Sequence, residues 1–399
     1  MHHHLVIDVI GDAFADIYCY LEAGMPQHGG DARLLRPMHT VAGGSGLNTA
    51  THLSSLLQQF WVRDDDGDGD TKAGRTWNVS LQTVINEHDD YGKLISSHCS
   101  RHGFALFNRR VMVCSHDNGI DGNDKSTGHC AVIVSNGDRS FMTYLGCMED
   151  FRGSHVLAYA SLDDGTTQSC NDVVRHRHVH IAGYYNIQGF WDGELACKLA
   201  EIRGVEANKG NRSTTTISLV PQQDATEKWD GGLLALLQYI DFLFLSEVEA
   251  RKITRYMPTM MSDDNDRTHF LRHVAEFAPF VNSKTVVIVT LQSKGAVALH
   301  DGSVKHRQNT SPEIDNPIDP TGAGDAFAAG FLYGYLSFRG ERGGIVEDEE
   351  AVKEGMRWGC ATGTSSVMVQ GASVPSQKEC IERVLNCITR PHNGPDVHH

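Results

Sequence analysis

The chain has 399 residues, of which 40% are hydrophobic and 21% are charged, and its formal net charge at pH 7 is −15. This composition is typical of a globular protein with one large domain or two modest ones. The acidic balance argues against a surface for nucleic acid or for an anionic membrane, because both carry negative charge themselves. No apolar run approaches the roughly 20 residues that a membrane-spanning helix needs.

The ten cysteines include no C-x-x-C pair, and most of them lie far apart. In a chain of this size, such spacing favours reduced core thiols rather than a disulfide framework. Residues 1–4 lack the apolar region of a signal peptide, and residues 396–399 carry no retention or peroxisomal sequence. We therefore expect a cytoplasmic protein.

The chain opens with an apolar run at residues 5–10 that predicts a buried strand. This run leads directly to Gly11, Asp12 and Asp16. Open α/β sheets bind their ligands at the carboxyl ends of their strands. Asp12 and Asp16 are therefore candidate ligand-binding residues.

Gly43 and Gly44 precede a predicted helix that runs toward residue 60. Two adjacent glycines allow the backbone to approach a ligand closely, and Asn48 would project its amide from the first helical turn. The alternative is a glycine-rich helix entry in which Asn48 is only a cap residue.

Residues 63–78 form a polar insertion in which Asp64, Asp66 and Asp68 imitate the first half of a calcium loop. The twelfth position of that loop is Arg75, where a bidentate Glu is needed. We therefore predict a disordered surface loop rather than a calcium site.

The next segments predict a strand at residues 79–85 and a helix at residues 90–102 that ends at Gly103. Short β runs follow between residues 104 and 144, at residues 111–113, 130–134 and 141–144. Their alternating polarity suits a small sheet that is solvated on one face.

His176, His178 and His180 alternate along the chain, which places them on one face of a predicted strand. A metal site there is conceivable, but no Cys, Asp or Glu in the same run completes it. We expect these side chains to be exposed to solvent.

Strands and helices alternate over the rest of the chain. The predicted strands are residues 217–219, 242–245 and 285–290, and the predicted helices are residues 191–205, 231–239, 247–256, 267–277, 349–369 and 376–388. This alternation predicts a parallel sheet with helices on both faces. No linker is long enough to separate two independent domains.

The sequence DPTGAGD at residues 319–325 precedes an apolar run that can form a helix. Pro320 biases the residue before it toward extended backbone, and Gly322 and Gly324 permit a tight turn free of side chains. A helix that begins at such a turn presents unpaired N–H groups and the positive end of its dipole, which together suit an anion. Asp325, in the first turn, is either a simple partner of the dipole or a base held beside a bound phosphate.

The two glycine-containing segments resemble the signatures of the ribokinase-like (PfkB) carbohydrate kinase family. Residues 41–50 resemble its N-terminal signature and residues 319–325 its C-terminal signature, in the right order. The resemblance implies a three-layer α/β/α fold with a central, mostly parallel sheet, in a single domain over residues 1–399. It also implies a small β-sheet lid, formed by residues 16–42 and 104–147, that would exclude water from the reaction.

The resemblance assigns roles at both signatures. Asp325 would be the catalytic base, and the backbone N–H groups of Gly322, Ala323 and Gly324 would stabilise charge on the transferred phosphoryl group. The residues expected to bind the sugar are Asp12, Asp16, Gly43, Gly44 and Asn48.

Two further segments resemble the nucleotide side of the family. Residues 245–249 stand where the family has N-x-x-E, with Ser246 in place of the phosphate-binding Asn and with Glu249 retained to organise Mg²⁺ through water. The alternative for Glu249 is an exposed carboxylate at a helix start. Residues 290–295 resemble T-L-G-S-K-G, with Gln292 in place of a glycine.

Gly371 and Ala372 resemble a segment that closes over the nucleotide base. In several family members this segment also supplies carbonyls to a monovalent cation, which would be K⁺ beside Asp319 and Thr321. The predicted nucleotide-binding residues are Ser246, Thr290, Gln292, Gly295, Thr321 and Gly371.

The resulting prediction is an enzyme, a Mg²⁺-dependent kinase that transfers the γ-phosphate of ATP to a hydroxymethyl group of a small, ribose- or fructose-like sugar. One alternative acceptor is a nucleoside such as adenosine, which needs an aromatic slot from residues such as Phe14, Phe141 or Tyr144. Another alternative is a non-catalytic regulator that binds a sugar or a nucleotide, although the intact Asp325 argues against it. We expect no nucleic-acid or membrane partner, and the lid is a candidate homodimer interface.

Overall fold

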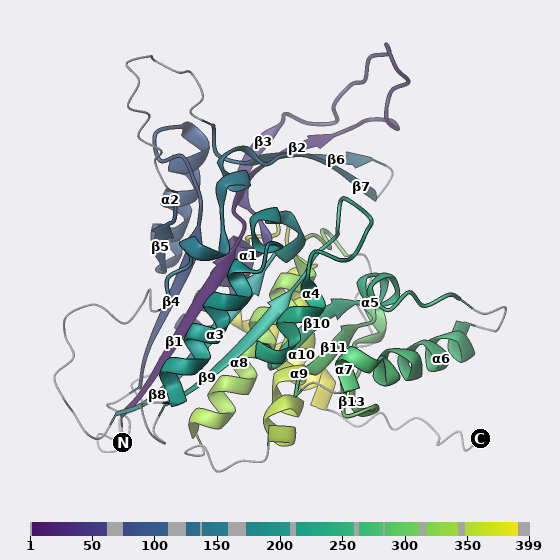
Figure 1. The fold of residues 1–399 in the computed structure, drawn as a ribbon. Coiled ribbons are helices and arrows are strands. Elements are labelled where there is room, and N and C mark those ends of the chain that lie inside the picture. The colour runs from purple at the N-terminus through teal and green to yellow at the C-terminus, as the bar shows by residue number, and fades with distance from the viewer. Residues whose placement is uncertain are drawn as a thin grey trace.

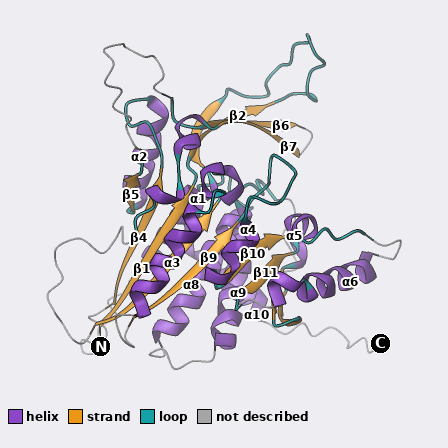
Figure 2. Cartoon of the chain, viewed as in Figure 1, coloured by secondary structure: helices purple, strands orange, loops and turns teal. Residues whose placement is uncertain are grey.

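The computed structural model of this chain describes residues 2–61, 75–110, 125–135, 138–158, 173–207, 213–258, 263–281, 284–310, 317–341 and 348–389. These residues form one large β-sheet with helices on both faces, and a small second sheet stands at one end of it (Figure 1). Figure 2 shows the helices that cover the large sheet and the small sheet at its upper end. The predicted fold, a three-layer α/β/α arrangement with a small additional sheet, is confirmed.

The large sheet has the strand order β13-β12-β11-β10-β9-β8-β1-β4-β5 within the described residues. Strand β1 pairs in parallel with both β4 and β8, whereas β11, β12 and β13 are antiparallel neighbours at one edge. The strands are β1 His2–Gly11, β4 Arg75–Thr83, β5 Ala105–Asn108, β8 Val173–Ala182, β9 Ser213–Val220, β10 Phe242–Ser246, β11 Val286–Thr290, β12 Ala296–His300 and β13 Ser303–Gln308. Because the strands from β5 to β11 are parallel, their carboxyl ends share one edge of the sheet.

Two apolar cores lie against the large sheet. The first contains Leu47, Phe331 and Met356 from helices α1, α8 and α9, and the second contains Leu199 and Phe270 from helices α3 and α6. The α-helices are α1 Ser45–Leu56, α2 Asp90–His102, α3 Glu194–Ala207, α4 Leu233–Leu236, α5 Glu247–Ile253, α6 Asp263–Glu276, α7 Ala278–Val281, α8 Ala323–Glu341, α9 Asp348–Ser366 and α10 Lys378–Thr389. Among the described helices, none combines the length and the apolar character that crossing a bilayer requires.

Glycines let helix α9 pack closely against helix α8. A Cβ atom at Gly330 would lie 2.6 Å from the carbonyl oxygen of Trp358, and one at Gly334 would lie 2.8 Å from that of Glu354. Side chains at these positions would force the two helices apart, because a packed interior has no space to absorb them. This close packing fixes helix α8, and with it Asp325 in its first turn.

The small sheet has the strand order β3-β2-β6-β7, with β2 and β6 parallel and the other pairs antiparallel. Its strands are β2 Phe14–Tyr20, β3 His39–Gly43, β6 His129–Ser135 and β7 Asp138–Tyr144. Tyr18 lies opposite Val132, and Arg139 lies opposite Val134. Since residues opposite each other or two apart share a face of a sheet, Asp16, Tyr18 and Arg139 point to the same side.

Several boundaries differ from the predictions. The helix at residues 90–102 is confirmed, because Asp89 caps its N-terminus and Gly103 ends it in the left-handed conformation. Strand β5 lies inside the range expected for the lid, but it pairs with β4 in the large sheet. The hairpin of β12 and β13 was not predicted. The strand predicted at residues 111–113 and most of the insertion at residues 63–78 lie outside the described residues.

The predicted exposure of the alternating histidines is wrong. His178 and His180 are fully buried, because β8 is an inner strand covered by helices on both faces. The Oγ atom of Ser218 lies 2.7 Å from Nε2 of His178 and 2.7 Å from Nδ1 of His180. Burial lowers the pKa of His180 to about 3, so this imidazole is neutral. The described residues hold no group of three His, Cys, Asp or Glu side chains that could bind a metal.

Candidate active site

Polar residues gather where the parallel strands of the large sheet end. Asp12 follows β1, Gln222 follows β9, and Ser246 and Thr290 are the last residues of β10 and β11. Helix α8 begins near this edge and brings Asp325 to it, as the hydrogen bond between Gln222 and Asp325 shows. This edge is where open α/β sheets bind their ligands.

The turn into helix α1 requires both of its glycines. Gly44 has a φ of 97°, and a Cβ atom there would lie 2.8 Å from the carbonyl oxygen of Asp12. A Cβ atom at Gly43 would lie 2.0 Å from Oδ2 of Asp16. The glycine pair therefore lets α1 approach the end of β1 and leaves room for the Asp16 carboxylate.

The turn at residues 319–325 has the geometry of an anion site. Gly322 has a φ of 76°, and a Cβ atom at Gly324 would meet no atom within 4 Å, so the space over Gly324 is open. Helix α8 begins at Ala323, whose N–H donates to the carbonyl of Pro320 at 3.3 Å. The N–H groups of Gly322 and Gly324 make no hydrogen bond to the described residues. Two of the three predicted amides are thus directly available to a ligand, and the third donates only a long bond.

The two signature segments meet at Asp325. Its Oδ1 accepts hydrogen bonds from Ser45 Oγ at 2.7 Å and from Gln222 Nε2 at 3.0 Å, and its Oδ2 accepts one from Asn48 Nδ2 at 2.9 Å. Burial raises the pKa of Asp325 to about 7, and the charges of Asp12 and Glu249 add to this effect. The donated hydrogen bonds offset part of the shift. A carboxyl group with such a pKa can exchange a proton near neutral pH.

Two more carboxyl groups face the same space. Burial raises the pKa of Asp12 to about 6, although the Gly46 N–H and the Asn186 amide donate to it at 3.0 Å and 2.7 Å. Burial also raises the pKa of Asp16 to about 7, with further contributions from the charges of Asp12 and Asp325. These mutual effects indicate that the three carboxyl groups lie close together.

Several polar groups at this site have no hydrogen-bond partner among the described residues. They include Oδ1 of Asn48, the hydroxyl of Tyr18 and Oγ1 of Thr321, all of them buried atoms. The Asp16 carboxylate likewise accepts no hydrogen bond from a described residue. Buried polar groups are normally satisfied, so these are the atoms expected to contact a bound ligand.

Ser246 and Glu249, which the sequence predicts on the nucleotide side, form a capping box at the start of helix α5. The Oγ of Ser246 accepts from the Glu249 N–H at 3.2 Å, and Oε2 of Glu249 accepts from the Ser246 N–H at 2.7 Å. Glu249 is half-buried rather than exposed, and burial raises its pKa. Its charge also raises the pKa of Asp325. A divalent cation near both would relieve this repulsion, so these oxygen ligands suit Mg²⁺.

The turn after β11 is strained in a way the sequence did not predict. Gln292 has a φ of 54°, in the left-handed region, where the family has a glycine. Gly295 has a φ of 90°, and a Cβ atom there would lie 2.0 Å from the carbonyl oxygen of Gln308. Thr290 is half-buried and donates to the carbonyl of Leu245 at 3.4 Å. The turn therefore keeps the conformation that a glycine would favour, and the backbone of Gln292 is strained as a result.

The segment at Gly371 folds back onto the turn that begins at Asp319. Oδ2 of Asp319 accepts from the Gly371 N–H at 3.0 Å, and its Oδ1 accepts from the Thr321 N–H at 2.9 Å. Arg139 of the small sheet also contacts Asp319, with 2.8 Å between Nη2 and Oδ1. A Cβ atom at Gly322 would lie 2.7 Å from that of Ala372. The predicted proximity of these segments is therefore present, with Arg139 as an additional member.

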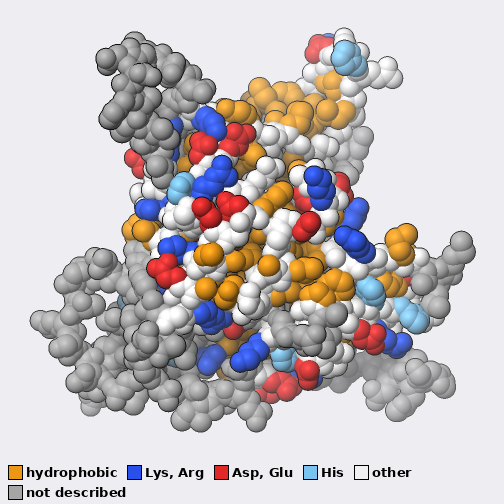
Figure 3. All heavy atoms as spheres, viewed as in Figure 1, with side chains coloured by type: hydrophobic (Ala, Val, Ile, Leu, Met, Phe, Trp, Pro, Cys, Tyr) orange, Lys and Arg blue, Asp and Glu red, His pale blue; other side chains and the backbone are white. Residues whose placement is uncertain are grey.

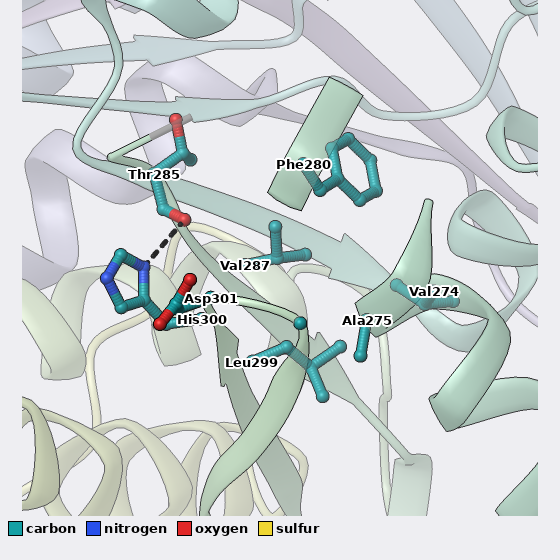
Figure 4. Close-up of a pocket in the computed structure, with 9 residues that line it drawn as sticks. Val274, Ala275, Phe280, Thr285, Val287, Leu299, His300 and Asp301 are labelled. Atoms are coloured by element: carbon teal, nitrogen blue, oxygen red, sulfur yellow. Dashed lines mark hydrogen bonds between the residues drawn. The ribbon is translucent and has the colours of Figure 1, made fainter. Parts of the chain in front are cut away.

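A small hollow, shown in Figure 4, lies away from this site. It is lined by apolar side chains such as Val274 and Phe280, and by Thr285, whose carbonyl lies 3.4 Å from Nδ1 of His300. Thr285 precedes β11, so this hollow is at the amino end of a strand whose carboxyl end reaches the active site. It holds none of the predicted site residues.

The side chains of the site that were not predicted from the sequence include Ser45, Gln222, Asn186 and Arg139. Gln222 and Asn186 follow β9 and β8 closely, so the rule that placed Asp12 could also have placed them. Arg139 carries no such signal, because its contact with Asp319 joins a strand of the small sheet to a turn far along the chain.

Known proteins resemble this chain in sequence and in structure. Residues 116–379 match the sequence profile described as pfkB family carbohydrate kinase. Adenosine kinase 1 of Arabidopsis thaliana is 24% identical over 259 residues, which are 63% of this chain and 65% of that protein. The chain thus matches slightly less than two thirds of the length of this relative.

Two solved structures share the fold over nearly their whole length. The ribokinase of Giardia lamblia has a TM-score of 0.65 at 17% identity, over 95% of this chain and 98% of that one. The Arabidopsis thaliana ribokinase complexed with ribose and ATP has a TM-score of 0.58 at 19% identity, over 96% of this chain and 99% of that one. At such identities the likeness shows the fold alone.

Proposed function

We propose, since the chain belongs to the pfkB family of carbohydrate kinases, that it transfers the γ-phosphate of ATP to a hydroxymethyl group of a small, ribose- or fructose-like sugar. One observation carries this proposal. The buried Asp325 carboxylate, with its pKa raised to about 7, sits in the first turn of helix α8 beside the open amides of Gly322 and Gly324. A base and an anion site are thus combined in a single turn.

The acceptor would lie against Asp16 and Asn48. The Asp16 carboxylate and Oδ1 of Asn48 are acceptors without partners among the described residues, and both suit hydroxyl donors. Asp12 is already bound by Gly46 and Asn186, so it would shape the floor of the site rather than grip the sugar. A compound rich in hydroxyl groups satisfies more of these unpaired atoms than an apolar one.

In the reaction, the oxygen of the acceptor hydroxyl would attack the γ-phosphorus of ATP, and Asp325 would accept the proton of that hydroxyl. The bond from the γ-phosphorus to the bridging oxygen would break, and ADP would leave. Phosphoryl transfer depends mainly on positioning and on charge neutralisation, and proton loss can follow attack in a loose transition state. The N–H groups of Gly322 and Gly324, with the dipole of α8 behind them, would stabilise charge on the transferred group, and the Ala323 N–H would join them by exchanging its long bond to Pro320.

The nucleotide would lie along Ser246, Thr290, Gln292, Gly295, Thr321 and Gly371. The partnerless Thr321 hydroxyl is suited to donate to a phosphate oxygen. Mg²⁺, when bound with ATP, neutralises charge on the β- and γ-phosphates, and Glu249 would hold it through water. The Oγ of Ser246 accepts from the Glu249 N–H, so its O–H can still donate to a phosphate oxygen while it caps helix α5.

The small sheet would act as the lid of this site. Its face that carries Asp16 also carries Arg139, which reaches Asp319 next to the glycine-rich turn.

Exposed apolar side chains gather on the strands and loops of this sheet, where Figure 3 shows an apolar area, and they support it as a homodimer interface. They include Met25, Leu35, Met38, Phe141, Met142 and Tyr144. Sedimentation equilibrium of Met142→Lys against the natural chain would test this, and an unchanged mass would remove the interface.

A nucleoside acceptor is the second candidate, and one observation favours it. The rings of Tyr18 and His39 are stacked with centroids 5.2 Å apart, and Tyr20 stacks on the same group. This aromatic set lies on the lid face that carries Asp16, where a base could stack. The residues considered from the sequence are less suited, because Phe141 and Tyr144 are largely exposed and Phe14 is buried in the core.

The decisive experiment is an ADP-release assay with ATP, Mg²⁺ and a panel of sugars and nucleosides. The Asp325→Asn variant should retain binding of ATP and acceptor, measured by calorimetry, while kcat falls by about 10²–10⁴-fold. Asp90→Asn is the matched control, because Asp90 also lies in the first turn of a helix but is exposed. Near-normal kcat in Asp325→Asn would remove the assigned base. Binding without turnover by the natural chain would favour a regulator instead.

A further inference from the structure

The monovalent cation implied beside Asp319 and Thr321 does not fit the geometry found there. Asp319 is only 4% exposed, and both of its carboxylate oxygens are engaged. Its Oδ2 accepts from the Gly371 N–H at 3.0 Å, and its Oδ1 accepts from the Thr321 N–H at 2.9 Å. The same Oδ1 lies 2.8 Å from Nη2 of Arg139. The anionic ligand that an alkali cation would use is therefore already neutralised.

A guanidinium and an alkali cation at this carboxylate would exclude each other. The Arg139 side chain is 17% exposed and the Asp319 side chain 5%, so little solvent would screen two positive charges placed side by side. Unlike an alkali cation, the guanidinium is covalently attached to the chain and presents a planar set of N–H donors to the carboxylate. No buffer ion can replace it by mass action while the lid is in this position.

From these contacts we infer that Arg139 is a built-in counter-cation of Asp319, so that the kinase needs no K⁺. Arg139 would act as a positioning residue. Its charge holds the Asp319 carboxylate, and that carboxylate ties the Thr321 and Gly371 backbones together around the glycine-rich turn. The inference rests on the proposed function for its activity measurements, but not for its stability measurements.

The position of Arg139 gives this charge a second consequence. It lies on β7, opposite Val134 of β6, and β6 in turn pairs with β2, which carries Asp16. The same sheet therefore contributes Asp16 to the acceptor side and Arg139 to the nucleotide side. Docking of this sheet would complete both halves of the site together, whereas a freely diffusing cation could bind with the sheet docked or undocked.

The test compares the natural chain with Arg139→Ala in KCl, NaCl and choline chloride at equal ionic strength. For the natural chain, kcat/KM should agree within about twofold in the three salts. For Arg139→Ala, kcat/KM in choline should fall by at least about tenfold, the loss expected for one charge-assisted contact. KCl should then raise the kcat/KM of Arg139→Ala at least about threefold above its value in choline, because the space left by the guanidinium and the carboxylate of Asp319 would admit the cation.

The melting temperature provides a readout that does not depend on turnover. A cation that binds only the folded state raises it, so KCl should raise the melting temperature of Arg139→Ala above its value in choline and leave that of the natural chain unchanged. Arg139→Lys retains a positive charge and should behave like the natural chain. Arg33→Ala is the control for loss of a lid charge, since Arg33 is exposed and its side chain makes no hydrogen bond or ion pair to the described residues.

Two outcomes would overturn the inference. One is a natural chain whose activity rises more than about fivefold in KCl over choline, or whose melting temperature rises specifically with K⁺. The other is an Arg139→Ala protein that loses activity but whose kcat/KM and melting temperature do not respond to K⁺. That result would mean that the guanidinium binds the nucleotide phosphates instead. If the natural chain shows no turnover with any acceptor, the proposed function fails, and the melting temperatures still decide whether Arg139 replaces the cation.

Discussion

Replacing Asp16 with asparagine should stabilise this protein and impair its binding of the acceptor. Burial and the charges of Asp12 and Asp325 raise the pKa of Asp16 from 3.8 to about 7. The fold thus disfavours the ionised carboxylate relative to the unfolded chain. Stability from this group is fully present below pH 3.8 and is lost as the pH rises to about 7. Asparagine has the same shape and no charge, so it removes this cost.

The magnitude follows from the shift. A change from 3.8 to about 7 corresponds to about 4 kcal/mol at 1.36 kcal/mol for each pH unit. Because Asp16 is partly exposed, solvent screens this effect, and we expect about 1–2 kcal/mol at pH 8. In a protein of this length, that gain raises the melting temperature by about 1–3 °C. At pH 5 only about a third of the gain should remain.

The assay combines thermal unfolding at pH 5 and pH 8 with steady-state kinetics. The acceptor KM of Asp16→Asn should rise by about 10–100-fold, because a carboxylate that accepts from a hydroxyl is replaced by a neutral amide. Asp90→Asn, at an exposed helix start, should change neither quantity. A variant that is less stable at pH 8 than the natural chain, or one with an unchanged KM, would refute the assignment of Asp16 as a destabilising ligand for the acceptor.

Three further predictions concern neighbouring residues. The kcat/KM of the natural chain should fall by at least about tenfold for each pH unit below pH 7, since Asp325 must be ionised to act as a base and protonation of Asp16 weakens acceptor binding. A flat ADP-release profile from pH 5 upward would contradict this. Gly43→Ala should raise the acceptor KM and lower the free energy of unfolding by about 1–3 kcal/mol, because its Cβ would lie 2.0 Å from Oδ2 of Asp16. Gly204→Ala, whose Cβ meets no atom within 4 Å, should slightly stabilise the protein in the same denaturation measurement. Equal stability changes in the two variants would count against the packing argument. Gln222→Leu removes a 3.0 Å hydrogen bond to Asp325, so kcat should fall by about tenfold. The acidic limb of the pH–rate profile should also move to higher pH. If that limb does not move, the Gln222 amide does not affect the pKa of Asp325.

Local patterns in the sequence determined most of the architecture. The alternation of apolar strands and helices predicted the parallel sheet, and the sequence around residues 90–102 predicted helix α2 together with its end at Gly103. The glycine-rich segments at residues 43–48 and 319–325 predicted the two helix starts that build the site. Such features depend on residues within a few positions of each other, so they can be read without knowing the fold.

The tertiary structure alone decided which side chains meet. Ser45 and Asp325 are 280 positions apart, yet their side chains are hydrogen-bonded. The roles of Gln222 and Arg139, and the burial of His178, depend likewise on which strands and sheets come together. No short-range period encodes these contacts, because they arise only when the packing of distant elements brings polar groups into one dry space, where each must find a partner or a ligand.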